Sequence, residues 1–166
     1  MMFIGFDNGV TSEGIGVVST DNSYLPHLYK LPIKKELSYT KEAKNISRID
    51  FDGLCKVIED ILSSSEDKKL MIGLERPMVN SARFNASLSA VRALEATLIV
   101  LEKYSLPYQY IDSKEWQKLL LPKNLKGSDQ LKQASLDIGK RLFPHLNLKK
   151  DADGLLIAEY LKKTYN

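Results

Sequence analysis

Acidic residues stand at the ends of apolar runs in this chain, far apart in the sequence. Asp7 ends the run FIGFD, and Glu75 ends the run LMIGLE. Asp151 and Asp153 open the last apolar segment, DADGLLIAEYLKK. A charged side chain at the end of a buried strand is costly unless something compensates it, and carboxylate oxygens suit Mg²⁺. The pattern therefore predicts a fold that brings these segments to one edge, where carboxylates share divalent cations.

The periodicity of apolar residues predicts a mixed α/β chain. Strands are expected over residues 2–7, 14–20, 24–33, 70–75 and 107–112, and helices over residues 47–64, 87–103, 113–122, 128–143 and 151–165. The first two strands form a hairpin, and the third, which carries two prolines, belongs at an edge. A meander followed by alternating helices and strands favours a mixed sheet with helices on its faces. Functional sites of such sheets gather at the carboxyl ends of the strands, where Asp7 and Glu75 lie.

Local signals refine three boundaries. Ser47 with Asp50 resembles a capping box at the start of the first helix, and Ser113 is expected as the N-cap of the short third helix. Residues 76–87 are expected to form a loop.

Size and composition predict one soluble domain over residues 1–166. The chain is 43% hydrophobic and 27% charged, as in ordinary globular proteins. We find neither an apolar run near the roughly 20 residues of a membrane span nor the pattern of a secretory signal. The single cysteine, Cys55, lies in a helical pattern that favours a buried thiol. These features predict a cytoplasmic protein with no membrane partner.

The positive charge is concentrated in the carboxyl-terminal part of the chain. Residues 1–100 contain 12 Lys and Arg against 13 Asp and Glu, whereas residues 101–166 contain 12 against 8. Residues 114–150 hold nine basic side chains and three acidic ones. A basic block beside acidic metal ligands suits a polyanionic substrate, although a solvated helix face explains the same charges.

These two features together predict a metal-dependent nuclease. Phosphodiester cleavage needs an activated water and neutralisation of charge on the phosphate, and two cations about 3.5–4 Å apart supply both. Asp7, Glu75, Asp151 and Asp153 are the predicted metal ligands and catalytic residues, with two Mg²⁺ or Mn²⁺ ions between them. Residues two apart on a helix lie about 200° around its axis. Asp153 is therefore the firmer ligand, and Asp151 is either a fourth ligand or the helix N-cap.

Five segments in this order resemble the RuvC-type Holliday-junction resolvases of the RNase H-like superfamily, especially bacteriophage-borne relatives. They are FIGFDNGVTSEGIGVVS, LERPMVN, NASLSAVRALEATL, YIDSKEWQK and DADGLLIAEY, and together they span most of the chain. The resemblance implies an α/β, RNase H-like fold: a five-stranded mixed sheet, three antiparallel strands then two parallel ones, flanked by helices. It also implies a homodimer that binds four-way DNA junctions and nicks opposing strands with Mg²⁺ or Mn²⁺.

By match to the family's motifs, Asp7, Glu75 and Asp153 correspond to the acids of the first strand, the fourth strand and the last helix. The family usually has an acid or a histidine three residues before that last acid, where this chain has Lys150. Lys150 could instead contact the scissile phosphate, and the role of Asp151 stays open.

Several other side chains are candidates for DNA contact. Arg76 and Arg83 could clamp phosphates or simply face solvent. Met78 and Phe84 correspond to the apolar wedge that the family inserts into a junction, although packing of the loop explains them too. The predicted basic contacts beyond the loop are Lys114, Lys118, Lys126 and Lys150.

Three further residues have a simpler interpretation beside a functional one. Trp116 could stack on a base, but core packing fits a large aromatic side chain better. Thr11 and Ser12 could contact a phosphate, but a plain turn fits them better.

Other functions and assemblies remain open at this point. The segment FDNGVTSEGIGVV also resembles the phosphate-binding hairpin of sugar kinases and actin-like ATPases, but 166 residues leave no room for their second lobe. A non-catalytic junction-binding module and a nuclease acting on RNA or other branched DNA are further alternatives. Small residues at helical spacing, Ala90, Ala93 and Ala96, could pack against a second copy or onto the sheet.

Overall fold

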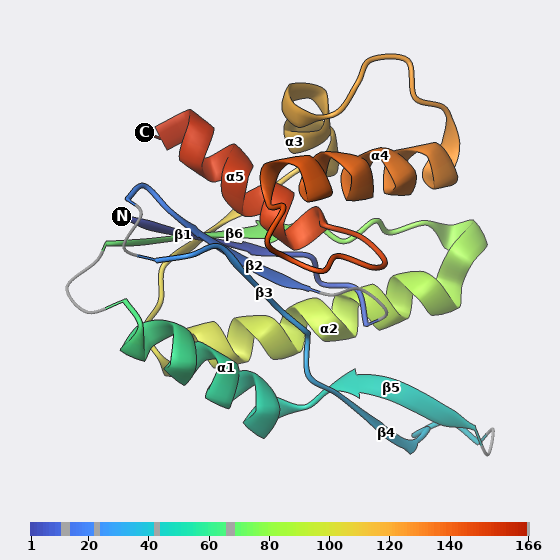
Figure 1. Ribbon diagram of the computed structural model, residues 1–166. Helices are drawn as coiled ribbons and strands as arrows, with labels where there is room; N and C mark the ends of the chain where they lie inside the picture. Colours follow the sequence, from blue (N-terminus) through green and yellow to red (C-terminus); the bar gives the residue numbers. More distant parts are fainter. Residues whose placement is uncertain (11–13, 22–23, 42–43, 66–68, 166) are drawn as a thin grey trace.

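The computed structural model describes residues 1–10, 14–21, 24–41, 44–65 and 69–165, and it centres on a five-stranded sheet (Figure 1). The strands lie in the order β3 (His27–Tyr29), β2 (Ile15–Ser19), β1 (Met2–Phe6), β6 (Leu70–Glu75) and β7 (Tyr108–Ile111). The pairs β1–β2 and β2–β3 are antiparallel, whereas β1–β6 and β6–β7 are parallel. The predicted sheet, three antiparallel strands followed by two parallel ones, is confirmed, with β3 at one edge.

Helices cover both faces of the sheet. In Figure 1, α1 (Phe51–Ser63) and α2 (Phe84–Lys103) lie below it. The helices α3 (Ser113–Leu120), α4 (Gly127–Leu142) and α5 (Asp153–Tyr165) lie above it, and a short 3₁₀ turn, η1 (Ser81–Arg83), precedes α2. This three-layer arrangement gives the central strands two buried faces, which explains why β1 and β6 are nearly continuous apolar runs.

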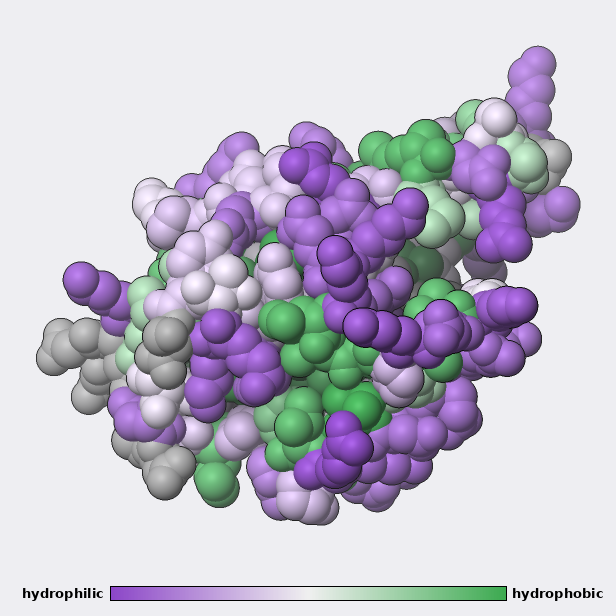
Figure 2. Space-filling model, turned by 90° about the horizontal axis from the view of Figure 1, so that it is seen from above, coloured by the Kyte–Doolittle hydropathy of each residue, from purple (hydrophilic) through white to green (hydrophobic). Residues whose placement is uncertain are grey.

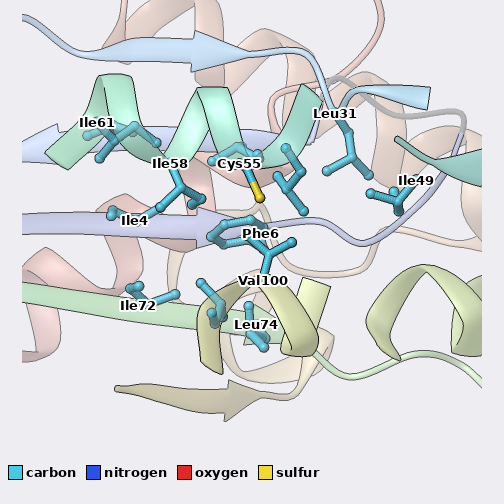
Figure 3. Close-up of a cluster of buried hydrophobic side chains, with 14 of the residues drawn as sticks. Ile4, Phe6, Leu31, Ile49, Cys55, Ile58, Ile61, Ile72, Leu74 and Val100 are labelled. Atoms are coloured by element: carbon cyan, nitrogen blue, oxygen red, sulfur yellow. The ribbon is translucent and has the colours of Figure 1, made fainter. Parts of the chain in front are cut away.

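Strand alternation divides the core into two parts. Ile4 and Phe6 point to the α1 and α2 side, where they meet Ile58, Val100 and Leu74 (Figure 3). Phe3, the neighbour between Met2 and Ile4, belongs to the opposite cluster under α5. Successive strand residues face opposite sides of a sheet, so the same short strand supplies both cores.

A second, separate hairpin follows β3 and was not predicted. Its strands are β4 (Ile33–Leu37) and β5 (Asn45–Ile49), which pair only with each other in the part of the chain that the structure describes. The prediction that a helix begins at Ser47 is wrong, because Ser47 pairs with Lys35 across the hairpin. The helix begins at Phe51, after Asp50 at the N-cap position. Charged residues fill β4 on both sides, so it lacks the apolar alternation that reveals a strand.

Smaller differences concern element ends. The third helix is capped by the Asp112 carboxylate, which accepts a hydrogen bond from the Lys114 N–H at 3.3 Å, and not by Ser113 as predicted. Helix α2 begins three residues earlier than expected, and α5 begins at Asp153. The predicted burial of Cys55 is confirmed.

Helix α2 has the composition of a core helix with one open side. The segment Ser81–Lys103 is long and apolar enough to cross a membrane by length and composition alone, because an 18-residue stretch within it has a mean hydropathy of 1.4. The sequence analysis did not expect an apolar segment of this length. Here its buried side chains, among them Ala93 and Leu101, pack into the core below the sheet. Packing onto the sheet, one of the two interpretations of the alanine spacing, therefore accounts for Ala93.

Candidate active site

Two of the predicted acids are neighbours because two parallel strands end together. Strands β1 and β6 are paired in register, with Phe6 opposite Leu74. Asp7 and Glu75 are the next residues along the two strands, so both reach the same carboxyl edge of the sheet. A hydrogen bond from a side chain to the backbone ties this edge together, since the Asn8 side-chain amide donates to the Glu75 carbonyl oxygen at 3.4 Å.

The third acid arrives on a helix that lies directly against the sheet. Asp153 is the first residue of α5. A Cβ atom added at Gly16 of β2 would lie 2.3 Å from the Leu155 nitrogen, and one at Gly154 would lie 2.7 Å from the Gly14 carbonyl oxygen. These glycines allow the helix backbone to approach the strand backbone, and the close approach carries Asp153 to the edge where Asp7 and Glu75 lie.

The three acids line one cleft of about 260 Å³. Its lining comes from the β1 and β6 ends and from α2, α3 and α5. The residues are Asp7, Asn8, Gly9, Glu75, Arg76, Pro77, Met78, Ala90, Ser113, Gln117 and Asp153. The sequence prediction that acids from distant segments share one cavity is met by Asp7, Glu75 and Asp153.

Burial and repulsion from neighbouring carboxylates raise the pKa values of two of these carboxyl groups. Burial, then the Asp7 charge, raises the pKa of Glu75 to about 8, against a hydrogen bond from Trp116 that lowers it. Burial also raises the pKa of Asp153 to about 7, with the Asp7 and Asp151 charges acting in the same direction. The Ser135 hydroxyl and the Lys132 charge oppose this rise. Such pKa shifts are frequent at functional sites. Here they indicate that too few positive charges lie near the carboxyl groups to offset burial and mutual repulsion.

Two side chains hold the acids in place, and the sequence analysis did not assign them this role. The Trp116 indole N–H donates to Glu75 Oε1 at 2.9 Å, and the Ser135 hydroxyl donates to Asp153 Oδ1. Trp116 is 1% exposed, so the interpretation of Trp116 as a core residue is correct and stacking on a base is wrong. No spacing rule links position 116 to position 75, because the contact depends on how α3 packs.

Asp151 lies beside this group and outside the cleft lining. It is half-buried, and its charge contributes to the raised pKa of Asp153. Because α5 begins at Asp153, Asp151 stands two residues before the helix and not at the N-cap position directly in front of it. Lys150 is exposed.

The donor set fits a hard divalent cation. The cleft offers carboxylate oxygens from Asp7, Glu75 and Asp153, the ligand type that Mg²⁺ prefers. Asn8 adds a buried Oδ1 with no hydrogen-bond partner among the described residues. Within those residues, no three His, Cys, Asp or Glu side chains already stand close enough to enclose one ion. The acids therefore share a cleft but do not form a closed metal cage.

The predicted DNA-contact residues are distributed around the cleft. Arg76 and Met78 line it, and the Arg76 guanidinium lies 5.0 Å from the centre of the Tyr110 ring. Met78 is 75% exposed and Phe84 is 67% exposed, so the interpretation that they pack against the core is wrong. Arg83 ends the η1 turn and is exposed.

The predicted basic contacts are on the side of α3 and α4. Lys114 and Lys118 are exposed on α3, and Lys126 is exposed just before α4. Figure 2 views the molecule from this side, with hydrophilic side chains around a smaller hydrophobic area. Thr11 and Ser12 lie outside the residues that the structure describes.

Comparison with known proteins finds similarity in structure alone. No family model matches the chain, and no curated protein sequence matches it. Among solved structures, RuvC of T. thermophilus in complex with a Holliday junction substrate matches with a TM-score of 0.58 and 13% identity, over 99% of this chain and 97% of the other. A structure of Thermus thermophilus RuvC matches with a TM-score of 0.57 and 13% identity, over 99% and 96%. The fold is therefore the RuvC-type, RNase H-like fold that the sequence resemblance implied.

Proposed function

We propose that this protein, which has the RuvC-type fold, is a divalent-metal-dependent endonuclease that cuts four-way DNA junctions and acts in the cytoplasm. One observation supports this most directly: three acids from three distant segments line one cleft at the carboxyl edge of the sheet. The similarity to RuvC bound to a Holliday junction substrate supplies the substrate class, and the basic residues of α3 and α4 suit a polyanion.

The acids would hold Mg²⁺, with Mn²⁺ as a substitute. Asp7, Glu75 and Asp153 are the ligands that we propose, with Asp151 as a fourth. When bound, two such ions supply a nucleophilic water and neutralise charge on the phosphate oxygens. Glu75 and Asp153 each give one oxygen to a donor of the protein, Trp116 and Ser135 respectively. That leaves the second oxygen of each carboxylate for a cation, with the carboxylate already oriented.

The residues at the rim would bind and position the DNA. Arg76 lines the cleft beside Glu75, and its guanidinium can donate two parallel hydrogen bonds to a phosphate. Met78 and Phe84 are large, apolar and exposed, as a side chain that separates stacked bases must be. Five further basic residues would contact phosphates and not base edges, so selectivity would depend on junction shape. They are Arg83, Lys114, Lys118, Lys126 and Lys150.

Substitution of the acids tests the proposal. Asp7→Asn and Glu75→Gln each replace an ionisable carboxyl ligand by a neutral amide of nearly the same shape, so each should abolish Mg²⁺-dependent nicking while junction binding persists. The measurement is nick mapping on a labelled four-way junction, with Y-shaped, flapped and RNA-containing substrates alongside. Asp137→Asn, on the exposed face of α4, is the charge-matched control and should cut normally.

Retained cleavage by either variant would contradict the metal-site assignment. Binding of junctions by the wild-type chain without nicking in Mg²⁺ or Mn²⁺ would favour a non-catalytic junction-binding module instead.

Paired nicking of opposing strands requires two copies of the site, so we propose a homodimer. Two-fold symmetry presents the same face twice. Ala93 is 2% exposed within its own core, so it does not contribute to a contact with a second copy. The outward side of α2 carries Val91, which is 42% exposed. Light scattering should give the mass of two chains at micromolar concentration, and the mass of one chain would count against the dimer.

A further inference from the structure

A second hollow lies between helix α2 and the β4–β5 hairpin. It consists of two adjoining cavities of about 330 and 450 Å³. Val10, Tyr39, Ser47, Ser89 and Arg92 line both of them. We call this continuous feature the hairpin groove. In Figure 1 the hairpin extends beside the amino-terminal half of α2, away from the five-stranded sheet.

The hairpin groove adjoins the cleft that holds the acids. Gly9 lines the cleft, and the next residue, Val10, lines the groove. On α2, Ala90 lines the cleft, and the preceding residue, Ser89, lines the groove. The same loop and the same turn of helix therefore border both hollows. A chain-like ligand that leaves the cleft across this border would enter the groove.

The lining of the hairpin groove suits a phosphodiester backbone. Three cations, Lys44, Arg48 and Arg92, line it against one acid, Glu95. Arg48 also forms an ion pair with Glu36 of the hairpin, with 2.6 Å between Nη1 and Oε2. Short polar side chains that donate hydrogen bonds line it as well, namely Ser38, Thr40, Asn45, Ser47, Asn85 and Ser89. Cationic, hydroxyl and amide donors of this kind make most contacts to DNA phosphates.

Arg92 in particular has one donor without an acceptor among the described residues. Its Nη1 donates to the Tyr39 hydroxyl at 3.3 Å, and its Nε is buried with no hydrogen-bond partner among the described residues. A buried donor without an acceptor is destabilising, and a guanidinium has five N–H donors in a planar fork that matches phosphate. The groove thus holds an arginine that is oriented by Tyr39 and forms no ion pair with a carboxylate among the described residues.

Tyr39 adds a flat surface at the mouth of the groove. Its side chain is 67% exposed, and its ring centre lies 5.7 Å from the Arg92 guanidinium carbon. Aromatic side chains beside cations bind single strands by stacking on bases without selecting a sequence. An exposed tyrosine supported by an arginine therefore favours nucleic acid over an acidic peptide as the occupant.

We propose that the hairpin groove binds the backbone of the DNA strand that leaves the catalytic cleft, with Arg92 on a phosphate and Tyr39 against a base or sugar. This inference rests on the proposed function, because it takes the strand in the cleft to be DNA. It gives the β4–β5 hairpin a role as a second DNA-binding surface, and it predicts that contact extends further on one side of the nick than on the other.

The test compares two sets of substitutions in divalent-free buffer. The groove variant is Lys44→Gln, Arg48→Gln and Arg92→Gln, and a milder Lys44→Gln, Arg48→Gln variant avoids the half-buried arginine if the first fails to fold. The control is Lys56→Gln with Lys69→Gln, two exposed lysines. Lys69 stands at the opposite end of the sheet from Asp7, since its carbonyl accepts from the Met2 N–H at 2.9 Å.

Fluorescence anisotropy with a labelled four-way junction should show a Kd at least about 10-fold higher for the groove variant. The slope of log Kd against log salt should fall by about 2, because each lost phosphate contact removes roughly 0.7–0.9 from it. In the groove variant, ethylation of phosphates on one side of the nick should no longer interfere with binding, whereas interference on the other side should persist. With Mg²⁺ and saturating protein, the control variant should nick at the wild-type rate, since neither of its lysines lines the cleft or the groove.

The outcomes separate this inference from the proposed function. Equal Kd values and salt slopes in the groove and control variants would overturn the groove assignment, and the proposed nuclease function would be unaffected if the wild-type chain nicks junctions. Groove-dependent binding without nicking would contradict the nuclease and leave the groove assignment intact. A wild-type chain that binds no DNA but binds poly-glutamate through the groove would overturn both.

Discussion

At the scale of single residues, the cleft is a set of carboxyl groups that lacks positive charge. Glu75 and Asp153 have pKa values of about 8 and 7, well above their ordinary values of 4.5 and 3.8. Burial is the main cause for both. A group that is protonated in the folded state and ionised in the unfolded state stabilises the fold less as the pH rises. The acids that would hold the cation therefore destabilise the protein when no cation is present.

The first prediction concerns how the free energy of unfolding depends on pH. The raised pKa of Glu75 means that its favourable contribution is complete below about pH 4.5 and is lost as the pH rises through about 8. Glu75→Gln cannot ionise, so its free energy of unfolding should exceed that of the wild type at high pH. The difference should grow by about 3 kcal/mol between pH 5.5 and pH 9. Urea denaturation in EDTA measures it, and parallel curves for the two proteins would contradict the assigned pKa.

The second prediction concerns Trp116 as a positioning residue. Trp116→Phe keeps an aromatic ring in the core but removes the N–H that holds Glu75 Oε1. Loss of such a partner typically weakens metal binding 10- to 100-fold. The Mg²⁺ concentration for half-maximal nicking should therefore rise about 10-fold.

Phe143→Leu is the control for Trp116→Phe, because Phe143 is 4% exposed in the same core cluster and its side chain has no hydrogen-bond donor. It should lower stability without moving the Mg²⁺ midpoint. If both substitutions shift the midpoint equally, the hydrogen bond has no special role.

At the scale of elements, α5 reaches the sheet because three glycines remove side chains from the interface. A Cβ atom at Gly5 would lie 2.3 Å from the Gly154 carbonyl oxygen and 2.6 Å from the Ala158 nitrogen. Both contacts are with backbone, which cannot rotate away as a side chain can. The packing that buries Leu155 and Leu156 also sets the position of Asp153, so stability and the site depend on the same interface.

Gly5→Ala should therefore lower both stability and nicking. Displacing α5 from β1 should cost about 3 kcal/mol, the upper part of the range for overpacked cores, and Asp153 would move with the helix. Gly127→Ala is the control, because a Cβ there meets nothing within 4 Å and only its φ of +78° is unfavourable. That strain costs about 1 kcal/mol. Thermal melting and nicking assays measure the two effects, and an unchanged Gly5→Ala protein would contradict the close packing.

Sequence patterns predicted the elements whose signal is local. The strands that lead to Asp7 and Glu75 are apolar runs followed by an acid, and both are confirmed. The last helix is confirmed too, but it begins at Asp153 and not at Asp151 as predicted. The β4–β5 hairpin was missed because its strands are stabilised by pairing with each other and carry charge on both faces. The contacts of Trp116 and Ser135 with the acids could not be predicted, since they depend on the packing of α3 and α4 against the sheet.

At the scale of the whole molecule, the cleft joins three parts of the chain that have no local reason to meet. The parallel pairing of β1 with β6 unites the first two acids, and the packing of α5 across the sheet adds the third. A cation bound there would therefore link the amino-terminal strand, the middle strand and the last helix, and it would relieve the repulsion among the acids. Metal binding should for this reason stabilise the entire fold.

The last prediction is that Mg²⁺ raises the melting temperature in a way that depends on pH and on the acids. A ligand that binds only the folded state at 100 times its Kd stabilises it by about 2.7 kcal/mol, which is roughly 5–11 °C for a chain of this size. The shift should be larger at pH 8 than at pH 5.5, because protons compete for Glu75 and Asp153 below their pKa values of about 8 and 7. Asp7→Asn and Asp153→Asn should reduce it sharply, whereas Asp137→Asn should not. The measurement is thermal melting with MgCl₂ against NaCl at matched ionic strength. An equal shift in all of these proteins would mean that Mg²⁺ stabilises the chain at some place other than the cleft.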